Sequence, residues 1–322
     1  MPSYVGRDYH ALAQHFDVSW GASLVGWRRG SGPRGWIPSP STLRVVRASK
    51  VVLQWFALPL APALAAVMLR RPLVVVAGGY DVAAVPEIGY GRMLGARTRF
   101  MGRSVLRLAR RVLSVSRYTQ AEVARAAPGV RAEVLYHGFE ASAFSPARVR
   151  VPKVVSVATL RRDYVRRKGL DTFAKASRLL PDVPFVLAGR IADQGVAAEL
   201  LAWGGPNLSL AGGLSDAALR ELLGHSAVYL QPSIHEAFGC AVAEAMLSGC
   251  TPVVSDRGAL PEVVGDCGYV IPADDPAQAA AAVRSALVSP RASAARERVE
   301  RLFSWSARER GLLDSLTPLV TA

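Results

Sequence analysis

Two glutamates, Glu236 and Glu244, stand close together in a segment whose spacing could support chemistry. Between them, Phe238 and Gly239 predict a tight turn, and we expect a helix to begin near Cys240. Backbone N–H groups at a helix start are free to bind an anion, and the helix dipole favours negative charge there. One loop therefore offers an acceptor carboxylate, an anion site and a second carboxylate about one turn into the helix.

Those three features are what a sugar, a diphosphate and a ribose would need if they were bound in a row. A plainer interpretation is also open. Glu244 could be an acid on the solvent side of the helix, and Glu236 could simply be a favourable partner of the helix dipole.

The residues that follow carry a longer pattern. After the helix come Ser248–Asp256, read as SGCTPVVSD, and Gly258–Val264, read as GALPEVV. The run from 232 to 272 resembles the donor-binding signature of the family 4 retaining glycosyltransferases, PS-x-x-E-x-F-G-x-x-x-x-E-A-M-x-x-G-x-P-V-V followed by G-x-x-P-E-V-V. The resemblance implies the glycosyltransferase B fold, in which two Rossmann-like domains face each other across a cleft that holds the active site.

The stretch 156–170 resembles the family element that binds the diphosphate of a nucleotide sugar through a lysine and an arginine. Lys168 matches the lysine. Ala158–Thr159 replaces the family's glycine–arginine, so Arg161 or Arg162 is left to supply the second charge, and we select Arg162. A cationic pair there would offset the charge that builds on the leaving nucleotide. The alternative for Lys168 is a solvated lysine at a helix start.

Two further glycine turns resemble the family's nucleotide-binding elements. Gly189 and Arg190 follow a strand-like run. Gly212 corresponds to the place where the family packs the nucleotide base, and a glycine there would let the backbone approach the base. Simple turn chemistry is the alternative for both glycines. The nucleotide-sugar site implied by the resemblance consists of Glu244, Lys168, Arg162, Phe238, Gly239, Cys240, Gly189, Arg190 and Gly212.

The match is thinner before residue 150. Ser114–Thr119 and Tyr136–Glu140 resemble two family turns, while Gly6–Arg7 replaces the usual double-glycine loop. Asp81 follows the strand-like run at 73–77, where many relatives carry an acid or histidine near the reacting sugar. A cap or turn aspartate is the alternative. The catalytic residues implied by the resemblance are Glu236, Lys168 and Asp81.

The elements that must position these residues alternate between strand and helix. Strands are predicted at 73–77, 111–116, 132–136, 153–158, 184–189, 227–233 and 251–256. Helices are predicted at 122–127, 170–180, 217–223 and 241–248. A capping box at Thr119 and Glu122 is expected to start the first of them. Such alternation indicates parallel sheets covered by helices on both faces.

The alternation occurs twice, on either side of an aperiodic joint at 142–152. We therefore predict an α/β protein of two Rossmann-like doubly wound domains, with ligands beyond the carboxyl ends of the strands. The predicted boundaries are 1–148 for an acceptor-side domain, 149–303 for a nucleotide-sugar-binding domain, and 304–322 for a helix crossing back to the first. The first domain opens unusually, with only the stub PSYV as a strand before a helix.

Two segments raise the question of a membrane. Residues 51–69 are almost entirely apolar and long enough to span a bilayer. Pro59 and Pro62 interrupt them, so we favour a broken helix packed on a sheet over a transmembrane span or a membrane-surface helix. Residues 97–111 are rich in arginine, with apolar residues on one side. They predict either an amphipathic helix at a membrane or anionic acceptor, or a helix with its apolar side on the sheet and its arginines in water.

Composition limits the classes of protein. With 322 residues, 51% hydrophobic and 20% charged, the chain has enough apolar material for two cores and is not disordered. A net charge of +14 favours anionic partners. Three cysteines without a CxxC, and no HExxH, argue against a disulfide scaffold and a zinc site. The opening MPSYVGRDYH lacks a signal peptide's apolar stretch, so we expect a cytoplasmic protein.

The resemblance thus implies a metal-independent retaining glycosyltransferase of the hexosyltransferase type, with no cofactor. It would move a sugar from a nucleotide-diphosphate sugar to a lipid-linked, saccharide or small-molecule acceptor, with peripheral membrane contact on the inner face as an open possibility. Two alternatives stand beside it: a non-catalytic relative that binds nucleotide sugars, and a basic nucleic-acid-binding protein. No aromatic-rich strand motif or helix-turn-helix supports nucleic-acid binding, so we expect none.

Overall fold

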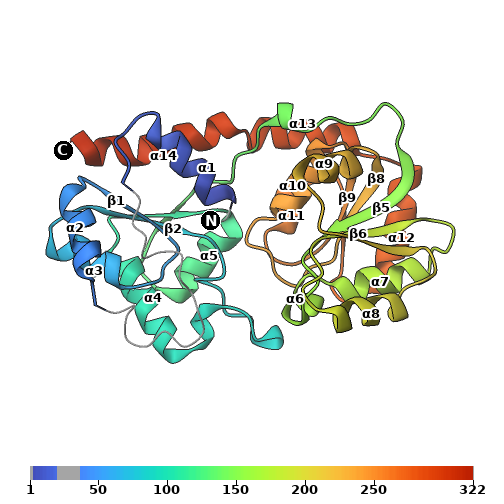
Figure 1. Cartoon of the computed structure of the whole chain (residues 1–322), viewed down its shortest axis with the longest axis horizontal. Coiled ribbons are helices and arrows are strands. Elements are labelled where there is room, and N and C mark those ends of the chain that lie inside the picture. Colours follow the sequence, from blue (N-terminus) through green and yellow to red (C-terminus); the bar gives the residue numbers. More distant parts are fainter. Residues whose placement is uncertain (1–2, 20–36, 322) are drawn as a thin grey trace. The chain divides into compact units, whose positions relative to one another are not determined.

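The computed structural model describes residues 3–19 and 37–321 (Figure 1). The chain forms two compact units, Met1–Gly138 with Trp305–Ala322 and Phe139–Ser304. Each unit contains one parallel sheet with helices against it, so the predicted α/β class with two Rossmann-like domains is confirmed. The division falls before residue 148 because the backbone of the joint bonds to the second unit: Phe139 N donates to Phe303 O at 2.9 Å, and Ala147 N to Gly224 O at 3.1 Å.

The first unit has a four-stranded sheet in the order β1-β2-β3-β4. Its strands are β1 (Val52–Trp55), β2 (Leu73–Ala77), β3 (Arg111–Ser114) and β4 (Ala132–Val134). Its helices are α1 (Ser3–Ala13), α2 (Pro40–Ala48), α3 (Ala61–Met68), α4 (Ala96–Leu108), α5 (Arg117–Ala126) and α14 (Trp305–Thr321). Every residue of β2 is buried, as expected for a β-branched run covered on both faces.

The apolar segment 51–69 is not one broken helix, and that prediction is wrong in its first half. Residues Val52–Trp55 form β1 and pair in parallel with Leu73–Val76 of β2. The helix α3 begins only at Ala61, with a proline in its first turn, where a proline costs no hydrogen bond. In the described ranges, none of the helices combines the length and the apolar character needed to cross a bilayer.

Two other local predictions in the first unit are corrected. The predicted opening strand is absent from residues 3 to 5, since α1 already begins at Ser3; Pro2 lies outside the described residues. The helix α5 begins one turn earlier than the capping box suggested. Its N-cap is Ser116, whose Oγ accepts a hydrogen bond from Thr119 N at 2.9 Å.

The helix α14 belongs to the first unit and is fastened there by Arg308, whose side chain is 1% exposed. Its Nη2 forms an ion pair with Asp8 Oδ2 at 2.6 Å, and its Nη1 donates to Leu135 O at 2.7 Å. The guanidinium also lies 5.3 Å from the ring centre of Trp55. Since a charge is buried at low cost only when it is paired and hydrogen-bonded, these contacts hold α14 against α1 and β4.

The second unit has a six-stranded sheet in the order β10-β9-β8-β5-β6-β7. Its strands are β5 (Val151–Val157), β6 (Phe185–Ala188), β7 (Leu208–Gly212), β8 (Ser226–Gln231), β9 (Thr251–Ser255) and β10 (Tyr269–Ile271). Its helices are α6 (Arg162–Arg167), α7 (Leu170–Arg178), α8 (Gln194–Trp203), α9 (Asp216–Gly224), α10 (Cys240–Leu247), α11 (Leu260–Val264), α12 (Pro276–Val288) and α13 (Ala292–Leu302).

The order of this sheet reverses between β5 and β8. From β5 the chain proceeds outward through β6 and β7, and it then returns to place β8 on the other side of β5 (Figure 1). The connections that leave β5 and β8 therefore depart in opposite directions. In open parallel sheets, ligands bind beyond the carboxyl ends of the strands at such a reversal.

Candidate functional site

The predicted site residues Lys168 and Glu236 meet at this reversal. Lys168 ends α6, which follows β5, and Glu236 lies in the loop that follows β8. The Lys168 ammonium forms an ion pair with Glu236 Oε1. Two more groups donate to the same oxygen: the amide Nε2 of Gln231, and the Ser233 hydroxyl at 3.0 Å.

These contacts keep the Glu236 carboxylate ionised although the residue is only 8% exposed. Burial by itself would raise the pKa of Glu236. The charges of Lys168 and Arg167 and the hydrogen bonds from Lys168 and Ser233 outweigh burial, so the pKa of Glu236 lies below its ordinary value. The site thus holds a buried carboxylate that is charged at neutral pH.

Backbone contacts fix both loops at this point. Gly169, which follows Lys168, has a φ of +64°, and a Cβ there would lie 2.1 Å from Pro232 O. On the other side of the loop, Gly258 has a φ of +63°, and a Cβ there would lie 2.5 Å from Glu236 O. Ala259 N also donates to Glu236 O at 2.9 Å. Only glycine fits these two positions, because the backbone of the Glu236 loop passes directly against them.

The helix α10 begins at Cys240, as predicted, with Gly239 as N-cap at a φ of +105°. Gly239 has no side chain, so the N-cap residue makes no capping bond of its own. The first N–H groups of an α-helix have no partner within the helix, which suits this position to an anion. Glu244 lies one turn along α10 and is partly exposed.

Phe238 has a different surrounding from the one predicted. Its side chain is buried between Phe139, with ring centres 5.9 Å apart, and Phe303, with ring centres 5.1 Å apart. The ring therefore anchors the turn before α10 in the core of the second unit. Its predicted place in a nucleotide-sugar site stays a prediction.

Arg162 and Lys168 are not brought together. Arg162 forms a two-point pair with Glu199 of α8, at 2.6 and 2.7 Å, on the exposed side of α6. Arg167, which the sequence reasoning missed, is buried and lies 4.2 Å from the ring centre of Tyr164. Its charge is among the causes that lower the pKa of Glu236. Its position beside Lys168 in the sequence was the signal that could have identified it.

Gly189 and Gly212 are the two glycines predicted at the nucleotide, and glycine is favoured at each of them for a different reason. At Gly189, with a φ of +145°, a Cβ would lie 1.9 Å from Ala158 O, so the chain leaving β6 runs directly against the end of β5. Gly212, with a φ of +69°, has open space around the position of a Cβ. Its backbone conformation alone favours glycine. Arg190 follows Gly189 and is exposed at the carboxyl end of β6.

Asp81 belongs to the first unit, in the turn after β2. It is buried, and its two carboxylate oxygens accept hydrogen bonds from Ala57 N at 2.7 Å and Gly78 N at 3.1 Å. Burial raises the pKa of Asp81 to about 6, against the lowering effect of these backbone bonds. Such contacts tie two loops together, which is the arrangement of a structural carboxylate. Its predicted catalytic role stays a prediction.

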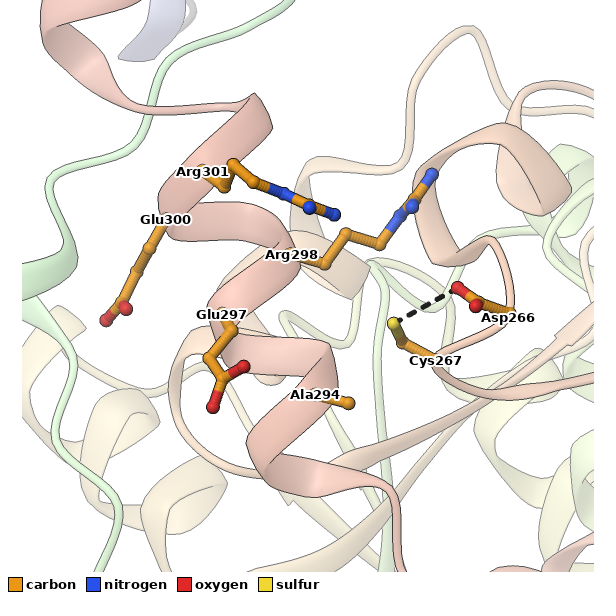
Figure 2. Close-up of a pocket in the computed structure, with 7 residues that line it drawn as sticks. All are labelled: Asp266, Cys267, Ala294, Glu297, Arg298, Glu300 and Arg301. Carbon is orange, nitrogen blue, oxygen red and sulfur yellow. Dashed lines mark hydrogen bonds between the residues drawn. The ribbon is translucent and has the colours of Figure 1, made fainter.

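A cavity of about 590 Å³ lies elsewhere in the second unit, between α13 and the loop after α11 (Figure 2). Figure 2 shows the guanidinium groups of Arg298 and Arg301 reaching from α13 toward that loop, where Cys267 bonds to Asp266. Arg298 donates to Val263 O at 2.9 Å and so serves to cap α11. The lining includes none of the predicted site residues.

The sequence of the second unit matches a known family. Residues 151–289 match the family model described as Glycosyl transferases group 1. The matched range covers most of the second unit. The resemblance deduced from the 236–264 motifs is therefore confirmed at this level. The matched range contains Lys168, Glu236 and Glu244.

Curated relatives and solved structures agree with this assignment. The chain is 32% identical over 185 residues to MMP alpha-(1->4)-mannosyltransferase of Mycolicibacterium hassiacum, covering 53% of this chain and 44% of that protein. It is 28% identical over 264 residues to alpha-maltose-1-phosphate synthase of Mycolicibacterium smegmatis, covering 71% and 64%. The chain thus spans less than two thirds of the length of either relative.

Among solved structures, sucrose-phosphate synthase from Thermosynechococcus elongatus superposes with a TM-score of 0.76 at 19% identity, covering 99% of this chain and 93% of that one. Anabaena HepE, solved in complex with UDP and glucose, gives a TM-score of 0.73 at 19% identity, covering 87% and 81%. At this identity the likeness establishes the fold, which is the glycosyltransferase B type.

Proposed function

We propose that this protein is a retaining glycosyltransferase of family 4 that uses a nucleotide-diphosphate sugar. One observation carries the proposal: a buried carboxylate, Glu236, is paired with Lys168 at the strand reversal, in the loop that leads into the start of α10. The match to the group 1 family model and the mannosyltransferase and synthase names of the relatives support it.

Lys168 and Arg167 are proposed to hold the diphosphate together with the N–H groups at the start of α10. Arg167 replaces Arg162 in this proposal, because Arg162 is engaged by Glu199 on the exposed side of α6. Charged hydrogen bonds and helix N-termini both favour phosphate oxygens. Glu244, one turn further along α10, is proposed to accept hydrogen bonds from the ribose hydroxyls, and Glu236 from the transferred sugar.

The proposed reaction proceeds on one face of the sugar. The acceptor hydroxyl oxygen forms a bond to the anomeric carbon while the bond from that carbon to the phosphate oxygen breaks. The leaving phosphate takes the proton of the acceptor hydroxyl. Lys168 and Arg167 stabilise the charge that develops on the leaving diphosphate, so no metal ion is required in this scheme.

Turnover of a panel of nucleotide sugars tests the proposal. UDP-glucose, GDP-mannose and ADP-glucose are first compared by thermal shift, and release of nucleoside diphosphate is then measured with and without EDTA. We expect one sugar to be turned over, with EDTA without effect and the anomeric configuration retained in the product by NMR. Binding without any turnover would instead support a non-catalytic relative, and an inverted anomeric product would refute the retaining mechanism.

A peripheral membrane contact is proposed for the first unit, which would suit a lipid-linked acceptor at the cytoplasmic face. The helix α4 has a buried side formed by Met101, Val105 and Leu106, so its apolar side packs on the core. On its opposite side, Phe100 is 59% exposed and stands between arginines. We define the basic face of α4 as Arg97, Arg99, Phe100, Arg103 and Arg107, of which Arg103 is half-buried and also donates from Nε to Ala126 O at 2.6 Å.

The basic face suits an anionic lipid surface for two reasons. The helix α4 contains no acidic residue, so nothing on it offsets the arginines. Phe100, Arg103 and Arg107 are spaced three and four residues apart, which places them along one side of the helix. An apolar ring among cations can enter the headgroup region while the guanidinium groups pair with lipid phosphates.

A further inference from the structure

A chain of buried polar side chains runs along β8 toward Glu236. The Tyr229 hydroxyl donates to Gln231 Oε1 at 2.9 Å, and Gln231 Nε2 donates to Glu236 Oε1. Tyr229, Gln231 and Ser233 occupy alternate positions, so their side chains leave the same face of the strand and its extension. All three are buried, and Tyr229 and Gln231 lie outside the motif that identified the site.

The direction of the hydrogen bonds in this chain is fixed by chemistry. An ionised carboxylate can only accept hydrogen bonds. The Gln231 amide must therefore turn its NH₂ toward Glu236 and its carbonyl toward Tyr229, whose hydroxyl is then the donor. Burial and the nearby charge of Glu236 raise the pKa of Tyr229, so the phenol stays protonated and keeps donating. Tyr229 thereby orients the amide that holds Glu236.

The contacts of Glu236 are one-sided. Lys168, Gln231 and Ser233 all bond to Oε1. Within the described residues, no hydrogen bond to Oε2 is found beside these three bonds to Oε1. Oε2 is also not one of the fully buried side-chain atoms that have no hydrogen-bond partner. One oxygen is thus held by the protein, and the other is left to a ligand.

We propose that Gln231, oriented by Tyr229, is a positioning residue that fixes Oε1 of Glu236 and so presents Oε2 to a hydroxyl of the transferred sugar. That this hydroxyl belongs to a transferred sugar rests on the proposed function. The proposal also explains how Lys168 can serve two anions. When a diphosphate takes up Lys168, the neutral donors Gln231 and Ser233 still hold Glu236 in place.

The ionisation of Glu236 depends on the groups around it. Lys168 and Arg167 face it from α6, and Tyr229 faces it from β8. Glu244 of α10 acts on Tyr229, and the turn that packs on the Glu236 backbone carries the ion pair of Asp256 with Arg257 at 3.3 Å. Removing Gln231 takes a hydrogen bond from the charged form of Glu236 and leaves these other groups unchanged.

The first test measures Glu236 directly and needs no substrate. The side-chain carboxyl of Glu236 is followed by ¹³C NMR against pH in the uniformly Glu-labelled full chain, with its resonance assigned by Glu236→Gln. We expect Gln231→Leu to raise the pKa of Glu236 by about one unit. Tyr229→Phe should raise it by a smaller amount, because the amide stays but is no longer oriented.

The control is Asn207→Ala. Asn207 is another partly buried amide of the second unit, and its Nδ2 donates to Val183 O at 2.6 Å and Leu180 O at 2.8 Å. Its loss should lower the unfolding midpoint without moving the pKa of Glu236. An unchanged Glu236 pKa in both Gln231→Leu and Tyr229→Phe would overturn the proposal.

The second test separates positioning from nucleotide binding. Gln231→Leu should lower kcat about tenfold or more while the Kd for nucleoside diphosphate changes less than about twofold. Equal losses in both would overturn the presentation of Oε2 to the sugar. A wild-type protein that transfers no sugar, but whose Glu236 pKa shifts as expected in the variants, would refute the proposed function and leave the Gln231 orientation intact.

Discussion

Lys168 and Glu236 form an ion pair across the strand reversal of the second unit, although they stand far apart in the sequence. Both residues were assigned separate partners on a bound nucleotide sugar. Their pairing means that the ammonium and the carboxylate offset each other's charge. A diphosphate that binds there must compete with Glu236 for the lysine ammonium.

Replacing Lys168 by alanine should weaken binding of a nucleoside diphosphate. Loss of a charged hydrogen bond at a partly buried site costs about 1.5–3 kcal/mol, which corresponds to about tenfold to 150-fold in Kd. Isothermal titration calorimetry measures the affinity. Lys175→Ala is the matched control, since that lysine is half exposed on α7 and pairs with Asp171 at 3.8 Å. Equal affinity in Lys168→Ala and the wild type would refute the assignment.

The two glutamates of the motif should respond differently to removal of their charge. Glu244→Gln should weaken binding of both the free nucleotide and the nucleotide sugar, because a carboxylate accepting two ribose hydroxyls is strong, charge-assisted recognition. Glu236→Gln should spare the free nucleotide and mainly lower kcat, because its contact is with the reacting sugar. Affinity and turnover are measured for both variants side by side. Equal loss of nucleotide affinity would contradict the division of roles.

Asp81 should make the first unit less stable as the pH rises. Its folded-state pKa of about 6 lies above its ordinary value of 3.8, so the folded state binds the proton more tightly. The corresponding stability is fully present below pH 3.8 and is lost as the pH rises through 6, by about 3 kcal/mol in all. Asp81→Asn removes this titration. Urea unfolding from pH 4 to 7 should therefore show the wild type losing stability relative to the variant.

A second measurement separates structure from catalysis at Asp81. Its backbone contacts predict that Asp81→Ala speeds hydrogen exchange at the amides of Ala57 and Gly78, which lose their acceptor. The catalytic role would be favoured instead by three results together. The stability difference between the wild type and Asp81→Asn would stay constant with pH, hydrogen exchange at the two amides would be unchanged in Asp81→Ala, and turnover would be lost.

The basic face of α4 should bind anionic vesicles. Binding should rise with the fraction of phosphatidylglycerol and fall with salt, because screening weakens the attraction between surface charges. The double variant Arg99→Gln with Arg107→Gln should reduce co-sedimentation, at about 1 kcal/mol per arginine. Arg284→Gln with Arg301→Gln changes the same charge on exposed positions of the second unit. Equal binding by the two double variants would show that overall charge, and not the basic face of α4, attracts the lipid.

Much of the architecture follows from local sequence. The apolar runs that become β2, β8 and β9 are almost entirely buried, as expected for parallel strands covered by helices on both faces of the sheet. The start of α10 follows from Phe238–Gly239, because a left-handed glycine before an apolar helical run ends one element and begins the next. The motif from Glu236 onward is local as well, which is why it carried the family resemblance.

Only the tertiary structure decided the rest, because the deciding contacts join distant parts of the chain. β1 was missed since its four residues become a strand only by pairing with β2. The sequence alone does not distinguish Arg162 from Arg167 as a partner of Lys168. The orientation of α6 in the fold decides that Arg162 pairs with Glu199 and that Arg167 acts on Glu236.

Gln231 shows the same limit within the site. In sequence it is one polar residue in an apolar strand. It holds Glu236 because the strand ends where its loop folds back, bringing Gln231, Ser233 and Lys168 around one oxygen of Glu236. Tyr229 lies behind Gln231 and bonds to its amide oxygen. A residue's type fixes which hydrogen bonds it can form, and the packing of β5 against β8 determines which of them it does form.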